Sequence, residues 1–164
     1  MNRGSNPLVF LLSLLLALVL QMVALPDAVN PFRPLVLAMT LAYWAVYAAE
    51  MPALLAAWLL GLCCDVLYGA PLGQYALGLV TVAYAARRLS DTLLAFPLWQ
   101  ATLALIPVWA LYIFLMFWID GLTHHPADPL RRWLPLITTS LLWPLIAALL
   151  GGMNSRRSRR GILP

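Results

Sequence analysis

Blocks of about twenty apolar residues recur along this chain, each long enough to cross a hydrocarbon core of about 30 Å as a helix. Short polar segments separate the blocks. Only 10% of the 164 residues are charged and 63% are hydrophobic, whereas soluble domains carry roughly 25% charged residues. The sequence therefore predicts an all-α integral membrane protein and excludes an ordinary soluble domain.

Six membrane spans are predicted from these blocks and from the helix-starting signals at their ends. Asn6-Pro7 is such a signal, because proline at the first helical position removes an N–H that would have had no partner. Pro107 and Pro144 lie inside spans and predict kinks rather than breaks. The predicted architecture is a six-helix transmembrane bundle (1–152) with a basic tail (153–164), and its spans are 7–25, 34–49, 52–68, 71–86, 96–119 and 129–150.

The first apolar block also raises the question of a signal peptide. The run 7–25 is longer than the roughly 7–15 apolar residues of a secretory signal, and Leu25-Pro26-Asp27 is a poor cleavage site. We expect this block to remain as the first span.

The arginines predict the orientation of the bundle, and all ten basic residues are arginine. With the amino terminus inside, seven lie in cytoplasmic segments: Arg3, Arg87, Arg88, Arg156, Arg157, Arg159 and Arg160. Three lie in outer loops: Arg33, Arg131 and Arg132. Cytoplasmic segments carry the excess of positive charge in membrane proteins. Because six spans return the chain to its starting side, both termini are predicted to be cytoplasmic.

The four tail arginines, Arg156, Arg157, Arg159 and Arg160, have three candidate roles. A basic cluster beside a membrane binds anionic lipid with about 1 kcal/mol per arginine. The cluster can also dock a cytoplasmic partner, or act as an orientation signal alone. The sequence leaves these roles open.

One carboxylate, Asp65, lies at membrane depth in the stretch GLCCDVLYGAPLGQYALG (61–78). Ala53, Ala57, Gly61 and Asp65 recur every four residues and share one stripe of the third span. Small residues at this spacing let another helix approach closely. An ionised carboxylate in hydrocarbon costs at least roughly 2.5–3.5 kcal/mol, so Asp65 is expected to face inward to a partner.

The following segment, 68–73, predicts a tight turn between the third and fourth spans. Pro71 is expected to begin the fourth helix, which leaves the N–H groups of Leu72, Gly73 and Gln74 free at its positive end. We expect Asp65 to accept these N–H groups as a buried cap of the hairpin. The alternative is a proton or cation site, although no second acid, histidine or lysine lies at membrane depth.

No catalytic constellation is found in the sequence. An aspartyl protease needs two acids that share a proton, and only Asp65 lies at depth. Ser13 and Ser140 lie in spans, whereas His124 and His125 lie in the longest outer loop, far from either serine. We predict no enzyme and no cofactor.

Metal and nucleic-acid binding are not expected either. Asp128 and the adjacent histidines before it form a solvated loop more readily than a zinc site. Cys63 and Cys64 are neighbours on one helix and point about 100° apart, so they behave as small apolar side chains. The arginines are divided across the membrane and form no basic face for nucleic acid.

Aromatic residues at helical spacings leave a pocket open as an alternative to packing. The two groups are Tyr43, Trp44 and Tyr47, and Trp109, Tyr112 and Trp118. Some lie near span ends, where Trp and Tyr anchor at the headgroup level.

Three segments in order resemble the rod shape-determining protein MreD family: GLCCDVLYGAPLGQYAL (61–77), FPLWQ (96–100) and WIDGL (118–122). The resemblance extends to the length, the six spans and the basic tail. The family motif falls on Gly61, Asp65, Gly69, Leu72 and Gly73. The resemblance implies a six-helix bundle similar in fold to the substrate-binding subunits of energy-coupling-factor vitamin transporters.

The function implied by this resemblance is a non-catalytic inner-membrane subunit of the bacterial cell-wall elongation (rod) complex. Such proteins bind the single-span scaffold MreC, and through it MreB, RodA and a class B penicillin-binding protein, and they support cell shape and peptidoglycan synthesis. Contact with membrane lipid is expected, and a homodimer is left open. On this hypothesis a small-residue groove receives the partner's helix, and the structural or interface residues are Ala57, Gly61, Asp65, Gly69, Pro71, Leu72, Gly73 and Gln74.

The alternative function is the substrate-binding subunit of an energy-coupling-factor-type vitamin transporter. It requires polar side chains that converge on an outward-facing pocket, and only Gln74, Asp120 and the aromatic groups offer them.

Overall fold

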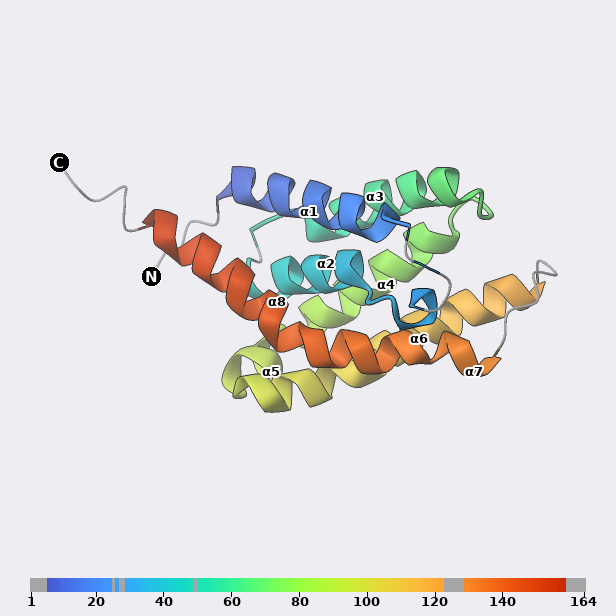
Figure 1. The fold of residues 1–164 in the computed structure, drawn as a ribbon. Coiled ribbons are helices and arrows are strands. Elements are labelled where there is room, and N and C mark those ends of the chain that lie inside the picture. The colour runs from blue at the N-terminus through green and yellow to red at the C-terminus, as the bar shows by residue number, and fades with distance from the viewer. Residues whose placement is uncertain (1–5, 25, 27–28, 49, 123–128, 159–164) are drawn as a thin grey trace.

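The computed structural model describes residues 6–24, 26, 29–48, 50–122 and 129–158. Every regular element in these ranges is helical (Figure 1). The elements are α1 (Pro7–Met22), η1 (Asn30–Phe32), α2 (Val36–Tyr47), α3 (Ala53–Tyr68), α4 (Gln74–Arg88), α5 (Ser90–Ala95), α6 (Leu98–Leu122), α7 (Pro129–Arg132) and α8 (Leu134–Ser158).

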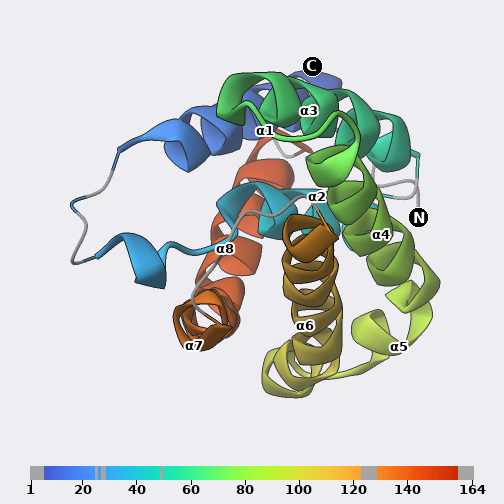
Figure 2. The same ribbon diagram turned by 90° about the vertical axis from the view of Figure 1, so that its right-hand side faces the viewer.

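Helix α2 forms the centre of the bundle. All ten residues from 37 to 46 are buried, as expected for a helix that is apolar on every side. Figures 1 and 2 show α1 and α3 over one side of α2, α6 and α8 over the opposite side, and α4 alongside. The short α2 is therefore shielded by longer helices and has little contact with the surroundings of the protein.

Aromatic side chains join α1 to this central helix. The rings of Phe10 and Trp44 meet edge to face with centroids 5.3 Å apart. The indole Nε1 of Trp44 donates a hydrogen bond to Ser13 Oγ over 2.9 Å, and Ser13 Oγ donates to the Phe10 carbonyl over 2.9 Å. These bonds satisfy the buried polar atoms that join the two helices.

The cap and proline predictions can be compared with the helices directly. Asn6 caps α1, and its side chain accepts a hydrogen bond from the Leu8 N–H over 3.1 Å. Pro107 and Pro144 lie inside α6 and α8, and both helices continue through them. Asp128, which precedes Pro129 at the start of the last predicted span, lies outside the described residues.

Helix boundaries differ from the predicted spans at several places. Helix α4 begins at Gln74 rather than Pro71, and α6 continues to Leu122, so Asp120 lies in a helix and not in a loop. The sequence did not predict α5, and α8 extends beyond the predicted limit at 150. The largest shift is at the carboxyl end of α8, which continues eight residues beyond the predicted limit to Ser158.

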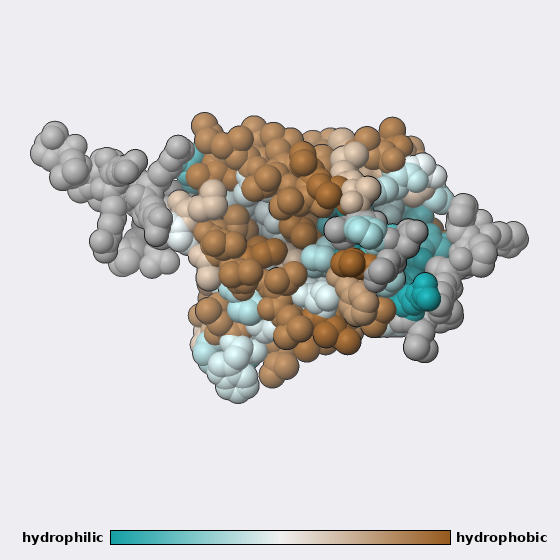
Figure 3. Space-filling model, in the orientation of Figure 1, coloured by the Kyte–Doolittle hydropathy of each residue, from teal (hydrophilic) through white to brown (hydrophobic). Residues whose placement is uncertain are grey.

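The outside of the bundle is apolar over most of its length. Figure 3 shows hydrophobic residues across the middle of one face, with hydrophilic residues gathered towards the end where α6 and α7 meet. Helix α1 alone exposes Leu8, Leu11, Leu12, Leu15, Leu16, Val19 and Leu20. Exposed apolar surface of this extent fits a lipid environment rather than water.

Two helices of the described chain are long and apolar enough to cross a membrane. They are Leu98–Leu122 and Leu134–Met153, with mean hydropathies of 2.1 and 1.8. Pro7–Met22 and Ala53–Tyr68 are shorter apolar helices.

Candidate functional site

The carboxylate of Asp65 joins α3 to the start of α4. Its Oδ2 accepts a hydrogen bond from the Gly73 N–H over 2.8 Å, and its Oδ1 accepts one from the Tyr75 N–H over 2.6 Å. Asp65 is only 1% exposed. The two N–H groups stabilise the buried charge, because carboxylate acceptors form short, strong bonds at the positive end of a helix.

The predicted cap is therefore present, but two of its predicted donors are wrong. The bond from Gly73 was expected, whereas the second bond comes from Tyr75 and not from Leu72 or Gln74. The Gln74 N–H donates instead to the Pro71 carbonyl over 3.1 Å. Pro71 does not begin α4 because it lies in the turn before Gly73, the N-cap residue.

The turn between α3 and α4 depends on backbone conformations that favour glycine. Gly69 has φ 63° and Gly73 has φ 98°, which L side chains rarely adopt. The Ala70 N–H donates to the Asp65 carbonyl over 2.9 Å and the Gly69 N–H to the Val66 carbonyl over 3.4 Å. This pair of bonds is the Schellman motif that ends many helices. Leu72, between the glycines, is 78% exposed.

The small-residue stripe of α3 packs against α4 of the same chain. Ala53 and Ala57 are fully buried. A Cβ added to Gly61 would lie 2.2 Å from the Ala76 Cα and 2.6 Å from the Ala76 N. The prediction that this stripe forms an open groove for a partner helix is therefore wrong. Four-residue spacing predicts close helix packing, but it does not say which helix is the neighbour.

A second polar cluster links α4, α6 and α7 near the same end. Gln74 Nε2 donates to Asp120 Oδ1 over 2.6 Å, and Asp120 forms an ion pair with Arg132. Gln74 is 5% exposed, and its Oε1 has no hydrogen-bond partner in the described residues. The cluster joins both sides of the segment 123–128 and fixes the end of α6 to the hairpin.

The end of α1 is held by side chains from two other segments. Arg33 donates to the carbonyl groups of Gln21 and Val23, the latter over 2.7 Å. The Tyr68 hydroxyl donates to the Gln21 carbonyl over 2.6 Å. Because the last carbonyl groups of a helix have no partner within it, these donors complete the end of α1.

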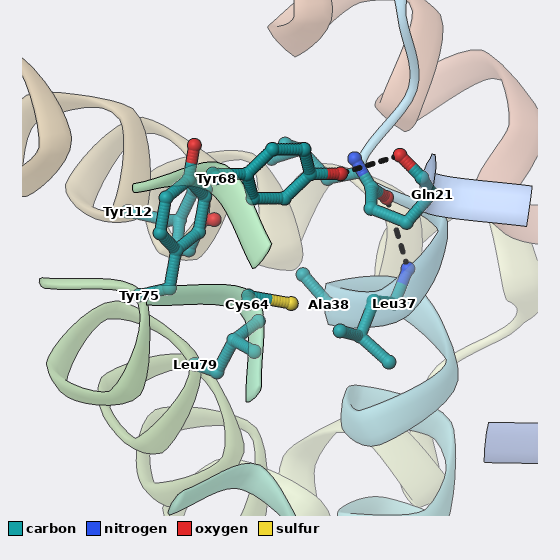
Figure 4. A pocket seen from close by; sticks show the side chains of 9 residues that line it. Gln21, Leu37, Ala38, Cys64, Tyr68, Tyr75, Leu79 and Tyr112 are labelled. Carbon is teal, nitrogen blue, oxygen red and sulfur yellow. Dashed lines mark hydrogen bonds between the residues drawn. The ribbon is translucent and has the colours of Figure 1, made fainter. Parts of the chain in front are cut away.

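A small pocket lies inside this end of the bundle. Its volume is about 250 Å³, counting the space open to solvent at its mouth. Three tyrosines, Tyr68, Tyr75 and Tyr112, lie along one side, and Gln21 and Leu37 lie opposite (Figure 4). Most of that volume is open solvent or gaps between atoms, and the room left inside the pocket is that of about one water molecule.

The aromatic groups singled out in the sequence are mostly packed. Tyr43 and Tyr47 stack with ring centroids 4.9 Å apart, and Trp109 lies 5.8 Å from Trp143. Of these residues, only Tyr112 lines the pocket described above. Tyr68, at the start of the predicted turn, and Tyr75, in the predicted fourth span, were not singled out, although both lie close in sequence to the motif at Asp65.

Other candidate residues contribute little to the described site. Cys64 is buried and Cys63 is exposed, and both are free thiols. No group of three metal-ligating side chains is found in the ranges that the structure describes. His124, His125, Arg159 and Arg160 lie outside those ranges, and Arg156 and Arg157 belong to the last turns of α8.

Together, the apolar exterior, the two helices of membrane-crossing length and the buried polar contacts define an all-helical membrane protein. The family model for the rod shape-determining protein MreD matches residues 2–152. The chain therefore belongs to the MreD family, a family of shape-determining membrane proteins rather than of known enzymes. No solved structure matches the chain.

Proposed function

We propose that this chain is a non-catalytic subunit of the bacterial cell-wall elongation complex and that it binds MreC. The observation that carries the proposal is the family match over nearly the whole chain. Through MreC the subunit is linked to MreB, RodA and a class B penicillin-binding protein, and it supports peptidoglycan synthesis during elongation.

We further propose that the chain forms six spans in the inner membrane, with both termini in the cytoplasm. The apolar segments and the arginine distribution support this topology. In this arrangement the α3–α4 turn and the Asp120–Arg132 pair lie at the periplasmic end.

The packing of α3 changes where a partner helix is expected to bind. Because α4 already covers the small-residue stripe, a single-span partner must dock on an outward-facing surface of the bundle. Asp65, Gly69 and Gly73 then act by holding the hairpin in shape and not by direct contact with the partner. Leu72, exposed at the tip of the turn, remains available for contact.

Co-purification tests this proposal. A tagged chain, expressed at its native level and extracted in mild detergent, is expected to recover MreC and, through it, the cell-wall synthases. An unrelated single-span protein at matched abundance serves as the control. Isolation of the chain without MreC under these conditions would contradict the proposal.

Depletion in cells separates this role from that of a vitamin transporter subunit. Loss of a rod-complex subunit is expected to round the cells at unchanged vitamin supply. A vitamin requirement without rounding would favour the transporter, although the pocket, with room for about one water molecule, does not hold a vitamin in this structure.

A further inference from the structure

The contact between α6 and α8 leaves two buried donors without an acceptor. The rings of Trp109 in α6 and Trp143 in α8 lie with their centroids 5.8 Å apart, and the two residues are 0% and 1% exposed. Neither indole N–H has a hydrogen-bond partner in the described residues, whereas the equally buried Trp44 donates its indole N–H to Ser13 Oγ. Because buried donors normally have a partner, the packing seen between α6 and α8 leaves hydrogen bonds unmade.

Each of the two helices also has a proline beside its tryptophan. Pro107 lies two residues before the tryptophan of α6, and Pro144 directly follows the tryptophan of α8. Since proline has no N–H, the carbonyl group four residues earlier loses its helical donor, and these carbonyl groups belong to Leu103 and Ser140. The α6–α8 contact therefore combines indole donors that lack acceptors with carbonyl acceptors that lack their helical donors.

Helix α8 is held differently on the two sides of Pro144. Before the proline, the Thr139 hydroxyl accepts a hydrogen bond from the Leu35 N–H over 3.1 Å. After the proline, the buried side chains described in α8 are those of Ala147 and Leu150. Figure 1 shows the first half of α8 alongside α6 and the second half leaving it. Because proline is a common cause of kinks in helices, the second half can change direction at Pro144.

We propose that the part of α8 after Pro144 (145–158) is a movable arm that pivots at this proline. In the position seen here, the rings of Trp109 and Trp143 pack together and their N–H groups are unpaired. In a second position the arm tilts, the two rings separate, and the N–H groups bond to the carbonyl groups that the prolines leave without a helical donor.

Movement at Pro144 is largest at the far end of the arm. The arm continues to Ser158, roughly 21 Å from the pivot at about 1.5 Å per residue. A change of about 20° in the kink displaces that end by roughly 7 Å. Arg156 and Arg157 belong to the last turns of the arm, so the packing of two buried rings controls the position of the basic tail. This pivot is independent of whether MreC binds the chain.

Distances between spin labels in the full chain test the pivot. The labels are attached to Leu111→Cys and Met153→Cys, both at exposed positions, in a chain that carries Cys63→Ser and Cys64→Ala. Double electron–electron resonance is recorded in phospholipid nanodiscs. We expect two distances that differ by roughly 7 Å, one for each position of the arm.

A matched pair of labels reports the part of α8 before the pivot. Leu111→Cys is combined with Ile137→Cys, which is also at an exposed position, and one distance is expected. A single distance for both pairs would show that the arm does not move. Two distances for both pairs would show that α8 moves as a whole. Either result would overturn the proposal.

Variants of the tryptophans and the proline test the cause of the movement. Trp109→Phe with Trp143→Phe keeps two aromatic rings and removes both N–H groups, so the population of the second distance should fall by roughly tenfold, as for two neutral hydrogen bonds. Pro144→Ala restores the helical donor to α8 and should have the same effect. Trp118→Phe, at an exposed position of α6, is the control and should leave both distances populated. Unchanged populations in the double phenylalanine variant would show that the N–H groups are satisfied in the packed position and would overturn the proposal.

Discussion

Asp65 shows how one charged residue can be stable in an apolar bundle. A buried carboxylate without a partner is unfavourable by several kcal/mol, yet Asp65 has two backbone N–H donors within 2.8 Å. The same two N–H groups belong to the start of α4, where they have no partner within the helix. The charge and the helix end therefore satisfy each other, which accounts for the stability of a buried acid in this bundle.

Replacement of Asp65 is expected to lower stability in proportion to the acceptors lost. Asp65→Ala leaves two buried N–H groups unpaired and should reduce the free energy of unfolding by roughly 2–5 kcal/mol. Asp65→Asn keeps one acceptor oxygen but directs its amide NH₂ at a second donor, so an intermediate loss is expected. Thermal unfolding in mild detergent measures both, with Asp91→Ala at an exposed position as the control. If all three variants unfold at the same temperature as the parent, the Asp65 cap does not stabilise the fold.

This residue was identifiable from the sequence because charge is rare at membrane depth. Its exact donors were not, since they depend on whether α4 begins at Pro71, as predicted, or after Gly73, as observed. Sequence signals permit both starts. The link between Gln74 and Asp120, 46 positions apart, also required the fold, because it depends on how α4 packs against α6.

At the scale of elements, α3 and α4 form a hairpin that is fixed at two levels. The carboxylate of Asp65 and the Schellman motif hold the turn. One turn deeper, Gly61 allows the backbone of α4 to approach closely at Ala76. The spacing of small residues in α3 predicted a close contact with another helix. The predicted neighbour, a partner's helix, was wrong because the same spacing is expected whether the neighbour belongs to this chain or to another protein.

Gly61→Ala is expected to force α3 and α4 apart. The new Cβ would overlap the Ala76 Cα at 2.2 Å, and overpacking of this kind costs about 1–3 kcal/mol or more. Ala76→Gly should not rescue the variant, because the overlap involves the backbone of residue 76. Thermal unfolding in detergent provides the measurement.

Gly121→Ala supplies the matched control for this packing. Gly121 is also helical, but a Cβ there meets nothing within 4 Å, and alanine favours helix by about 1 kcal/mol over glycine. Stability should stay equal or rise slightly. A Gly61→Ala protein as stable as Gly121→Ala would show that the close approach is not required.

At the scale of the whole molecule, composition alone predicted the class of protein. Each of the six predicted apolar blocks contains a helix in the structure. This was expected because backbone polar groups in lipid must form their hydrogen bonds within helices. Composition did not predict that α2 would be central and almost fully buried. The central position of α2 depends on which helices pack around it. An apolar side chain is compatible with either lipid or another helix as its neighbour, so the sequence does not distinguish the two.

The orientation of the molecule should depend on the four arginines of the tail. With them, the proposed topology has seven arginines inside and three outside; replacing Arg156, Arg157, Arg159 and Arg160 by glutamine leaves three on each side. Since positive charge retains segments in the cytoplasm, a fluorescent reporter after Pro164 should be active in the parent and partly lost in the variant. A phosphatase reporter at the same site should show the reverse change. Phosphatase activity in the parent would place the carboxyl terminus outside, while an unchanged variant would mean that packing of the helices, and not tail charge, determines the orientation.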